Sequence, residues 1–225
     1  MNFHIVTIFP DSLRSYVETS MLRKAVEYKK VKINFYNPRD LTTDAHKTVD
    51  GTPYGGGAGM VLKAEPIIKV VEKIKSKIRG KKIKIIILSA KGKQFTQKYA
   101  RDWQKKFDHI ILIAGRYEGI DERVKTILKA EEISVGPYVL TDGELPAGLI
   151  VSAITRLVPG VIRWESLQEE SHWGEKVSGE EKVLEYPHYT RPEIIKYKSK
   201  TYQVPKVLLG GNHAKIKAWR LGKSK

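Results

Sequence analysis

Short apolar, β-branched segments alternate with helical segments along most of this chain. The predicted strands cover residues 2–8, 31–36, 84–88 and 109–114, and residues 133–140 are a short strand that runs into a loop. Helical patterns cover residues 66–76, 94–105, 120–128 and 145–157. Because strands that alternate with helices form parallel sheets, this order predicts an α/β fold with a mainly parallel sheet. Ligands of such folds bind beyond the carboxyl ends of the strands, so we expect a site in the loops there.

Several classes of protein are excluded or disfavoured by what the sequence lacks. There is no cysteine, which excludes disulfides, thiolate catalysis and cysteine-based zinc sites. No segment approaches the roughly 18 consecutive apolar residues of a membrane span. The N-terminal segment lacks the basic start and the small-residue cleavage site of a signal peptide. We therefore expect a cytoplasmic location and no membrane partner.

The charge of the chain indicates a polyanionic partner. The formal net charge is +16 and the isoelectric point is about 9.8, which is typical of proteins that bind nucleic acid. A Lys-rich organism with generally basic proteins would give the same total. The distribution favours nucleic acid, because two basic regions, residues 69–106 and 191–225, flank an acidic segment with seven Glu and two Lys at residues 164–185.

The composition changes after Gly160 and predicts a domain boundary. Residues 163–184 are polar and acidic and contain Gly174 and Gly179, which is typical of a flexible linker. We expect one domain over residues 1–162, this linker, and a small basic region over residues 185–225. That last region shows little strand signal and is expected to be mainly helical.

Two loops in the predicted domain have the composition of a site. The glycine-rich run at residues 51–60 does not have the spacing of a phosphate-binding loop, so a mobile lid or substrate loop fits better than a phosphate site, and a structural turn is the alternative. Residues 114–124 place Arg116, Tyr117, Glu118 and Asp121 directly after a strand, as a ligand site would. Capping of a helix by Asp121 and surface ion pairs are the alternative.

Two further segments complete the candidate motifs. Residues 134–147 form a loop shaped by Gly and Pro, in which main-chain groups can hold an adenine or a ribose; a tight turn is the alternative. Aromatic, His and Arg residues interleave at residues 186–192 and 210–220, as on surfaces that stack bases and pair with phosphates. No ligand spacing supports a metal site at His188 and His213.

In this order, the motifs PYGGGAGM, LSAKG, GRYEGIDERV, YVLTDGELPA, PGV, EYPHYTRP and GNHAKIKAWR resemble those of bacterial tRNA (guanine-N1)-methyltransferases, the TrmD-like enzymes of the knotted SPOUT class. The resemblance spans residues 5–220. It implies a deep trefoil knot in the α/β domain and a homodimer with its active site at the subunit interface. It also implies transfer of a methyl group from S-adenosylmethionine to N1 of guanosine 37, 3′-adjacent to the anticodon of tRNA, in a reaction that requires magnesium at an unassigned site.

The resemblance also assigns binding residues by position. For S-adenosylmethionine they are Leu88, Ser89, Gly115, Tyr117, Glu118, Val135, Gly136, Pro137, Tyr138, Val139, Leu140, Gly143 and Pro146. For tRNA they are Tyr54, Gly57, Gly59, Arg116, His188, Arg191, Asn212, His213 and Arg220. The C-terminal region, which binds tRNA in the family, is shorter here than usual.

The chemistry requires a base and a cation. N1 of guanine carries a proton that a carboxylate must accept as the methyl group arrives, and the negative charge that develops on O6 is stabilised by an arginine. The matching residues are Glu170, where the family has aspartate, and Arg156, whose alternative role is a structural ion pair. The family also usually has an acidic residue at Gly51, a proline at Ala90 and a glycine at Asp142.

Two other functions fit part of this pattern. One is a related knotted methyltransferase with a different RNA target, and the other is a non-catalytic RNA-binding relative. The intact cofactor motifs favour an enzyme, since a protein that only binds RNA does not need them.

Overall fold

The computed structural model describes residues 1–78, 80–168, 171 and 185–224. The chain divides into two compact units, Met1–Ile162 and Arg163–Lys225. Residues 169–170 and 172–184, which include most of the predicted linker and the predicted base Glu170, lie outside the described part.

The first unit is built on a five-stranded parallel sheet. Its strands are β1 (Asn2–Val6), β2 (Lys32–Tyr36), β5 (Ile83–Gln94), β6 (His109–Ala114) and β7 (Glu131–Ser134), in the order β2-β1-β6-β5-β7. Each of the four strand pairs is parallel, which confirms the predicted α/β class. All six residues of β6 are buried, as expected of a central strand covered on both faces.

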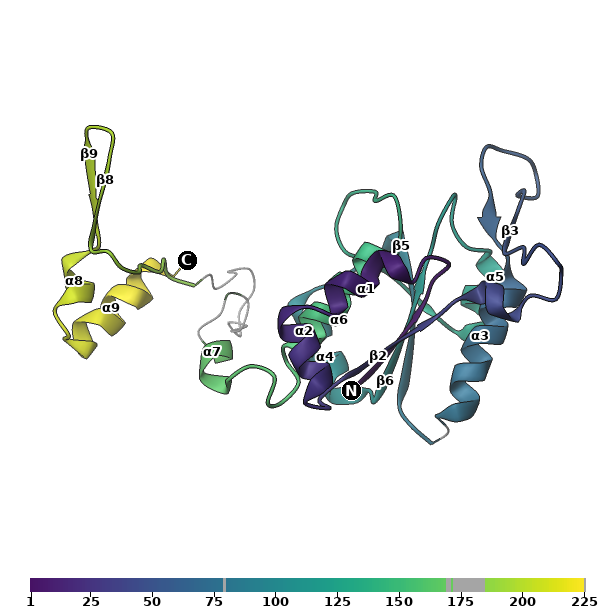
Figure 1. Ribbon diagram of the computed structural model, residues 1–225, viewed down its shortest axis with the longest axis horizontal. Coiled ribbons are helices and arrows are strands. Elements are labelled where there is room, and N and C mark those ends of the chain that lie inside the picture. The colour runs from purple at the N-terminus through teal and green to yellow at the C-terminus, as the bar shows by residue number, and fades with distance from the viewer. Residues whose placement is uncertain (79, 169–170, 172–184, 225) are drawn as a thin grey trace. The chain divides into compact units, whose positions relative to one another are not determined.

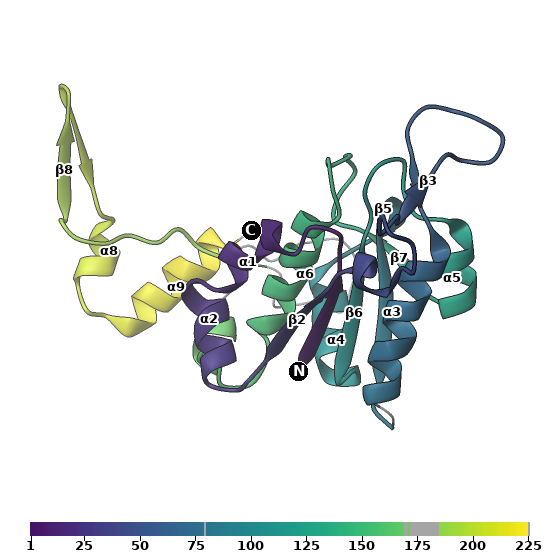
Figure 2. The same cartoon turned by 45° about the vertical axis from the view of Figure 1, so that its right-hand side comes forward.

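Helices cover both faces of this sheet (Figures 1 and 2). On one face lie α3 (Ala64–Lys77) and α5 (Glu122–Leu128), which pack against each other. On the other face lie α1 (Asp11–Val17), α2 (Ser20–Glu27), α4 (Gln97–Lys106) and α6 (Glu144–Thr155). The short helix η1 (Pro38–Leu41) and the strands β3 (Asp50–Gly51) and β4 (Val61–Leu62) flank the glycine-rich loop.

One apolar core lies between α3, α5 and the sheet. Val70, Val71 and Ile74 of α3 pack with Ile111 and Ile113 of β6 in one cluster of buried side chains. Each of these five side chains is at most 2% exposed, so burial of this face of α3 contributes on the order of 1.5–3 kcal/mol per side chain. The core therefore fixes the strands whose carboxyl ends carry the candidate motifs.

The structure shows where two of the predicted strands end. The strand predicted at residues 84–88 continues to Gln94, because a bulge between Leu88 and Lys93 lets it pair with β7 a second time. At residues 133–140, where a short strand was expected to run into a loop, the strand ends at Ser134, since the Ser134 hydroxyl bonds with Gly136 and turns the chain out of the sheet. Residues 135–140 are therefore free to form a loop.

The second unit is small and is described by itself. It contains α7 (Trp164–Gln168), β8 (Ile194–Tyr197), β9 (Lys200–Gln203), α8 (Lys206–Leu209) and α9 (His213–Lys223). The strands β8 and β9 form an antiparallel hairpin where the sequence shows little strand signal. In the described part of the chain, no helix is long and apolar enough to cross a membrane.

Candidate active site

A cavity of about 410 Å³ opens at the carboxyl ends of β5, β6 and β7. This is where ligands of parallel α/β folds bind. Of the predicted cofactor residues it brings together Leu88, Ser89, Gly115, Tyr117, Glu118, Val135, Tyr138, Val139, Leu140, Gly143 and Pro146. Gly136 and Pro137 are not among the lining residues. Three loops far apart in the sequence thus meet around one space.

Main chain approaches main chain on one wall of this cavity. The amide of Gly143 donates to the carbonyl of Gly115 over 2.9 Å. A Cβ atom at Gly143 would lie 2.6 Å from the nitrogen of Gly115 and 2.8 Å from Cα of Ala114, closer than real Cβ contacts. Only glycine at residue 143 permits this crossing, so the crossing explains why the motif has a glycine there.

Glycine also shapes the loop that follows β7. A Cβ atom at Gly136 would lie 2.3 Å from the ring of Tyr138, whose hydroxyl donates to the carbonyl of Val135. The absence of a side chain at Gly136, which does not line the cavity, leaves room for the Tyr138 ring to pack against this loop. This places the Tyr138 ring at the cavity wall, where an adenine can lie against it.

The glycine-rich loop is tied to the same site. The amide of Glu118 donates to the carbonyl of Met60, and the amide of Leu62 donates to the carbonyl of Gly119, each over 3.0 Å. A Cβ atom at Gly59 would lie 2.5 Å from Oε1 of Glu118. Tyr54, in contrast, is fully exposed at the far part of the loop. Gly59 thus lies beside the cavity, while Tyr54 extends into solvent.

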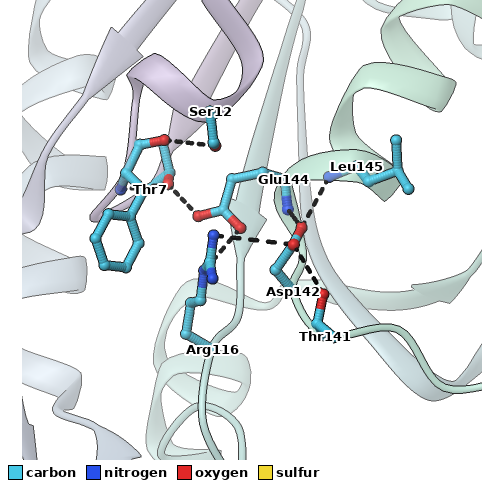
Figure 3. Close-up of polar contacts among 8 residues, drawn as sticks. Thr7, Ser12, Arg116, Thr141, Asp142, Glu144 and Leu145 are labelled. Atoms are coloured by element: carbon cyan, nitrogen blue, oxygen red, sulfur yellow. Dashed lines mark hydrogen bonds and ion pairs between the residues drawn. The ribbon is translucent and has the colours of Figure 1, made fainter.

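A buried ionic network lies beside the cavity (Figure 3). Glu144 is 2% exposed; its carboxylate accepts from Nε of Arg116 over 3.1 Å and from the hydroxyl of Thr7. The Arg116 guanidinium lies 4.6 Å from the ring centroid of Phe9 and 3.9 Å from Oδ2 of Asp142. The network joins the ends of β1 and β6 to the start of α6.

Asp142 caps this end of α6. Its Oδ1 accepts from the amides of Glu144 and Leu145 over 3.0 and 3.1 Å. Burial raises the pKa of Asp142, but the bond from Leu145 and the charge of Arg116 outweigh burial, and the net pKa is lowered. Asp142 is therefore ionised near neutral pH, and its negative charge stabilises the positive N-terminal end of the helix.

Opposite charges alternate at the rim of the cavity. Lys125 lies 2.6 Å from Glu132, and Lys91 lies 3.3 Å from Glu122 and 3.4 Å from Glu132. Burial raises the pKa of Glu132, but the neighbouring Lys125 and Lys91 lower it by more, so the net pKa is lowered. This carboxylate therefore stays ionised. The rim therefore carries both signs of charge, held in ion pairs.

Sequence reasoning missed Glu144 and Thr7 as parts of this site. Glu144 and Arg116 are 28 residues apart, and Thr7 is 137 residues from Glu144. The available signal was the acidic Glu144 at the start of an otherwise apolar helix, since a charge is buried only where it is paired. Arg116, predicted to contact tRNA, is held in the network and keeps 23% of its side chain exposed.

Of the two predicted catalytic residues, only Arg156 lies in the described part of the chain. Arg156 is the half-buried C-cap residue of α6 and is not among the residues that line the cavity. Glu170 lies outside the described part, but the next residue, Ser171, exchanges two hydrogen bonds with Glu185, of 3.2 and 3.0 Å.

In the second unit the two predicted tRNA motifs pack together. The guanidinium of Arg220 lies 4.6 Å from the ring centroid of Tyr186, and the rings of Tyr189 and Trp219 lie 6.3 Å apart. Asn212 caps α9, because its side chain accepts from the amide of Lys215.

The remaining predicted tRNA residues are exposed. His188 lies 3.2 Å from Glu185, while Arg191 and His213 leave their side chains on the surface of the unit. Within the described part of the chain, no three His, Asp or Glu side chains converge as a metal site would require, so no magnesium ligand is assigned.

Comparison with known proteins gives consistent matches. The family described as tRNA (Guanine-1)-methyltransferase TrmD matches residues 1–225. Three similar proteins named tRNA (guanine-N(1)-)-methyltransferase each align with 98% of this chain. The protein from Thermomicrobium roseum is 49% identical, with 77% of its length covered. The proteins from Dictyoglomus turgidum and Clostridioides difficile are 48% and 44% identical, with 83% and 90% covered.

Proposed function

This chain belongs to the tRNA (guanine-1)-methyltransferase TrmD family, and from that premise we propose that it transfers a methyl group from S-adenosylmethionine to N1 of guanosine 37 in tRNA. The observation that carries the proposal is the cavity at the carboxyl ends of β5, β6 and β7, which lies where the family motifs meet. The basic charge of the chain favours a tRNA partner.

The cavity has the chemistry that S-adenosylmethionine requires. Apolar side chains such as Leu88 and Pro146 offer surface to an adenine, and main-chain groups of residues 115 and 143 lie beside them. S-adenosylmethionine supplies a methyl group on a positively charged sulfur. The close crossing of Gly143 over Gly115 supports the further proposal that this loop belongs to a trefoil knot.

Glu170 and Arg156 are the proposed catalytic residues. Glu170 would accept the proton from N1 as the new N–C bond forms and the methyl–sulfur bond of S-adenosylmethionine breaks, which leaves S-adenosylhomocysteine, and Arg156 would stabilise the negative charge on O6. Replacing Glu170 with Gln removes the base but keeps its size, so turnover should fall far more than cofactor affinity. Single-turnover methylation and calorimetric titration of S-adenosylmethionine measure the two quantities. Near-normal turnover would remove Glu170 from this role.

A homodimer with the active site at the subunit interface is also part of the proposal. It is supported by an apolar surface on α1 and α6, where Leu145 is 61% exposed, Leu149 42% and Tyr16 48%. These side chains line a second cavity together with Leu13 and Gly148. Monomeric proteins rarely leave such a surface uncovered.

Subunit mixing tests the shared site. If Arg156 and Glu170 act across the interface, mixing inactive Arg156→Ala and Glu170→Gln subunits restores up to about a quarter of the sites by random exchange in a two-fold dimer. A mixture as inactive as its components would place both residues in one subunit's site.

Magnesium dependence is a prediction from the family alone, and no step is assigned to the ion. Activity that falls on addition of a chelator and returns with added magnesium would agree with it. Full activity in excess chelator would contradict it.

Primer extension tests the proposed target. The protein is incubated with tRNA and S-adenosylmethionine, and methylation at N1 blocks base pairing and stops reverse transcriptase one nucleotide before guanosine 37. A stop elsewhere would identify a methyltransferase with another RNA target. No stop despite cofactor binding would contradict catalysis on this tRNA.

A further inference from the structure

The hairpin of β8 and β9 belongs to the second unit and is exposed along its whole length. Among the described residues the two strands pair only with each other, and all eight of their residues are exposed. Within this unit, Figures 1 and 2 show the hairpin extending away from α8 and α9. An isolated two-stranded hairpin is marginally stable in water, so this one is expected to gain from a partner.

The two faces of the hairpin differ in chemistry. Residues directly opposite each other across an antiparallel pair lie on the same face. Ile195 pairs with Tyr202 and Tyr197 pairs with Lys200, and these four residues form what we call the aromatic face. The other face carries two pairs without aromatic rings, Ile194 with Gln203 and Lys196 with Thr201.

The aromatic face is open to solvent in this unit. Ile195 is 55% exposed, Tyr197 62% and Tyr202 53%. Tyr197 and Tyr202 are diagonal neighbours, which places them roughly 7–8 Å apart on the face. Two aromatic rings at that distance can each contact one of two neighbouring planar groups.

The charge of the hairpin selects the partner. Residues 194–203 contain Lys196, Lys198 and Lys200 and no Asp or Glu. The ammonium of Lys198, at the turn, lies 5.6 Å from the ring centroid of Tyr197. Aromatic rings with adjacent cations and no carboxylate are the combination that binds single-stranded RNA, whose bases stack on the rings while phosphates pair with the lysines.

Resting on the proposed function, we propose that the aromatic face of this hairpin, together with Lys198, binds unpaired bases of the tRNA substrate. Paired bases hide their faces in the stack of a duplex, so the target is a loop or another unpaired stretch. The contact adds affinity for tRNA without touching the cofactor cavity or the proposed catalytic residues.

Variants of the full-length protein test the stacking. Tyr197→Thr with Tyr202→Thr removes both rings and keeps residues that favour strands. We expect tRNA affinity, measured by fluorescence anisotropy, to fall about ten-fold or more. S-adenosylmethionine affinity should not change. Tyr197→Phe with Tyr202→Phe keeps both rings and should restore the affinity. Wild-type affinity in the Thr variant would overturn the proposal.

Two lysines of the hairpin provide a matched comparison. Lys200→Ala removes a charge from the aromatic face, and Lys196→Ala removes the same charge from the other face. The proposal requires a clearly larger loss of tRNA affinity for Lys200→Ala. Equal losses would show that net charge alone acts, and would overturn the role of the face.

A labelled oligouridylate and an RNA duplex of equal length separate base stacking from other uses of the surface. The wild type should prefer the single strand, and the double Thr variant should lose that preference. A change in sedimentation without a change in RNA affinity would assign the face to contact between copies of the chain and overturn the proposal. Because anisotropy needs no methyl transfer, an inactive wild type that still shows this preference would overturn the proposed function and leave the hairpin contact standing.

Discussion

Replacing Glu144 with Gln should destabilise the first unit, because it removes the charge that pairs with Arg116. The Glu144 side chain is 2% exposed and accepts hydrogen bonds from both Arg116 and Thr7. Removing one member of a buried ion pair costs about 3–5 kcal/mol, since the other charge stays buried without compensation. Arg116 keeps 23% of its side chain exposed and has Asp142 at 3.9 Å, so we expect a lower cost of about 2 kcal/mol.

Thermal unfolding at fixed protein concentration measures this cost. For a unit of this size, about 2 kcal/mol corresponds to a lowering of Tm by roughly 4–8 °C. The double variant Glu144→Leu with Arg116→Met provides the control. It removes both charges of this pair, so its loss of stability should be smaller than the sum of the losses in Glu144→Leu and Arg116→Met alone. An unchanged Tm in Glu144→Gln, or additive losses in the double variant, would refute the reasoning.

Three other predictions follow from the same structure. Gly143→Ala should abolish cofactor binding in a calorimetric titration, because its Cβ would lie 2.6 Å from the nitrogen of Gly115. Burial and the neighbouring His109 lower the pKa of His4 from 6.5 to about 4. Between these pH values the unfolded chain binds more protons than the folded one, so stability should fall as the pH drops from 6.5 toward 4. The variant His4→Asn should show a smaller fall in Tm over this range. Affinity for tRNA should decrease steeply with salt concentration because phosphate contacts release counterions. A flat response would contradict binding of the tRNA phosphates by basic residues.

The parallel sheet could be predicted because its signals are local. The run at residues 109–114 is apolar without alternation, as a strand covered on both faces requires, and it is β6 in the structure. The extension of β5 to Gln94 could not be predicted in this way, since Lys91 and Lys93 interrupt the apolar pattern. Gly92 was the missed signal: a Cβ atom there would lie 2.5 Å from the backbone of Glu132, so the close approach of β7 requires glycine.

The site was predictable where it consists of loops at strand ends, and not where it depends on tertiary pairs. Eleven of the thirteen residues that the motifs assign to the cofactor line the cavity, and Gly143 marks a close main-chain contact there. The pairing of Glu144 with Arg116 depends on how α6 crosses the end of β6, which no local pattern reports. The β8–β9 hairpin escaped prediction because its residues are exposed on both faces, so no alternation of buried and exposed positions shows in the sequence.

The central claim is tested most directly by the product of the reaction. Two tRNA transcripts that differ only in having guanosine or adenosine at position 37 are incubated with the protein and S-adenosylmethionine labelled on the methyl group, and the RNA is digested to nucleosides. We predict labelled 1-methylguanosine from the guanosine transcript and none from the adenosine transcript. Equal labelling of both transcripts, or label in any other nucleoside, would contradict the claim.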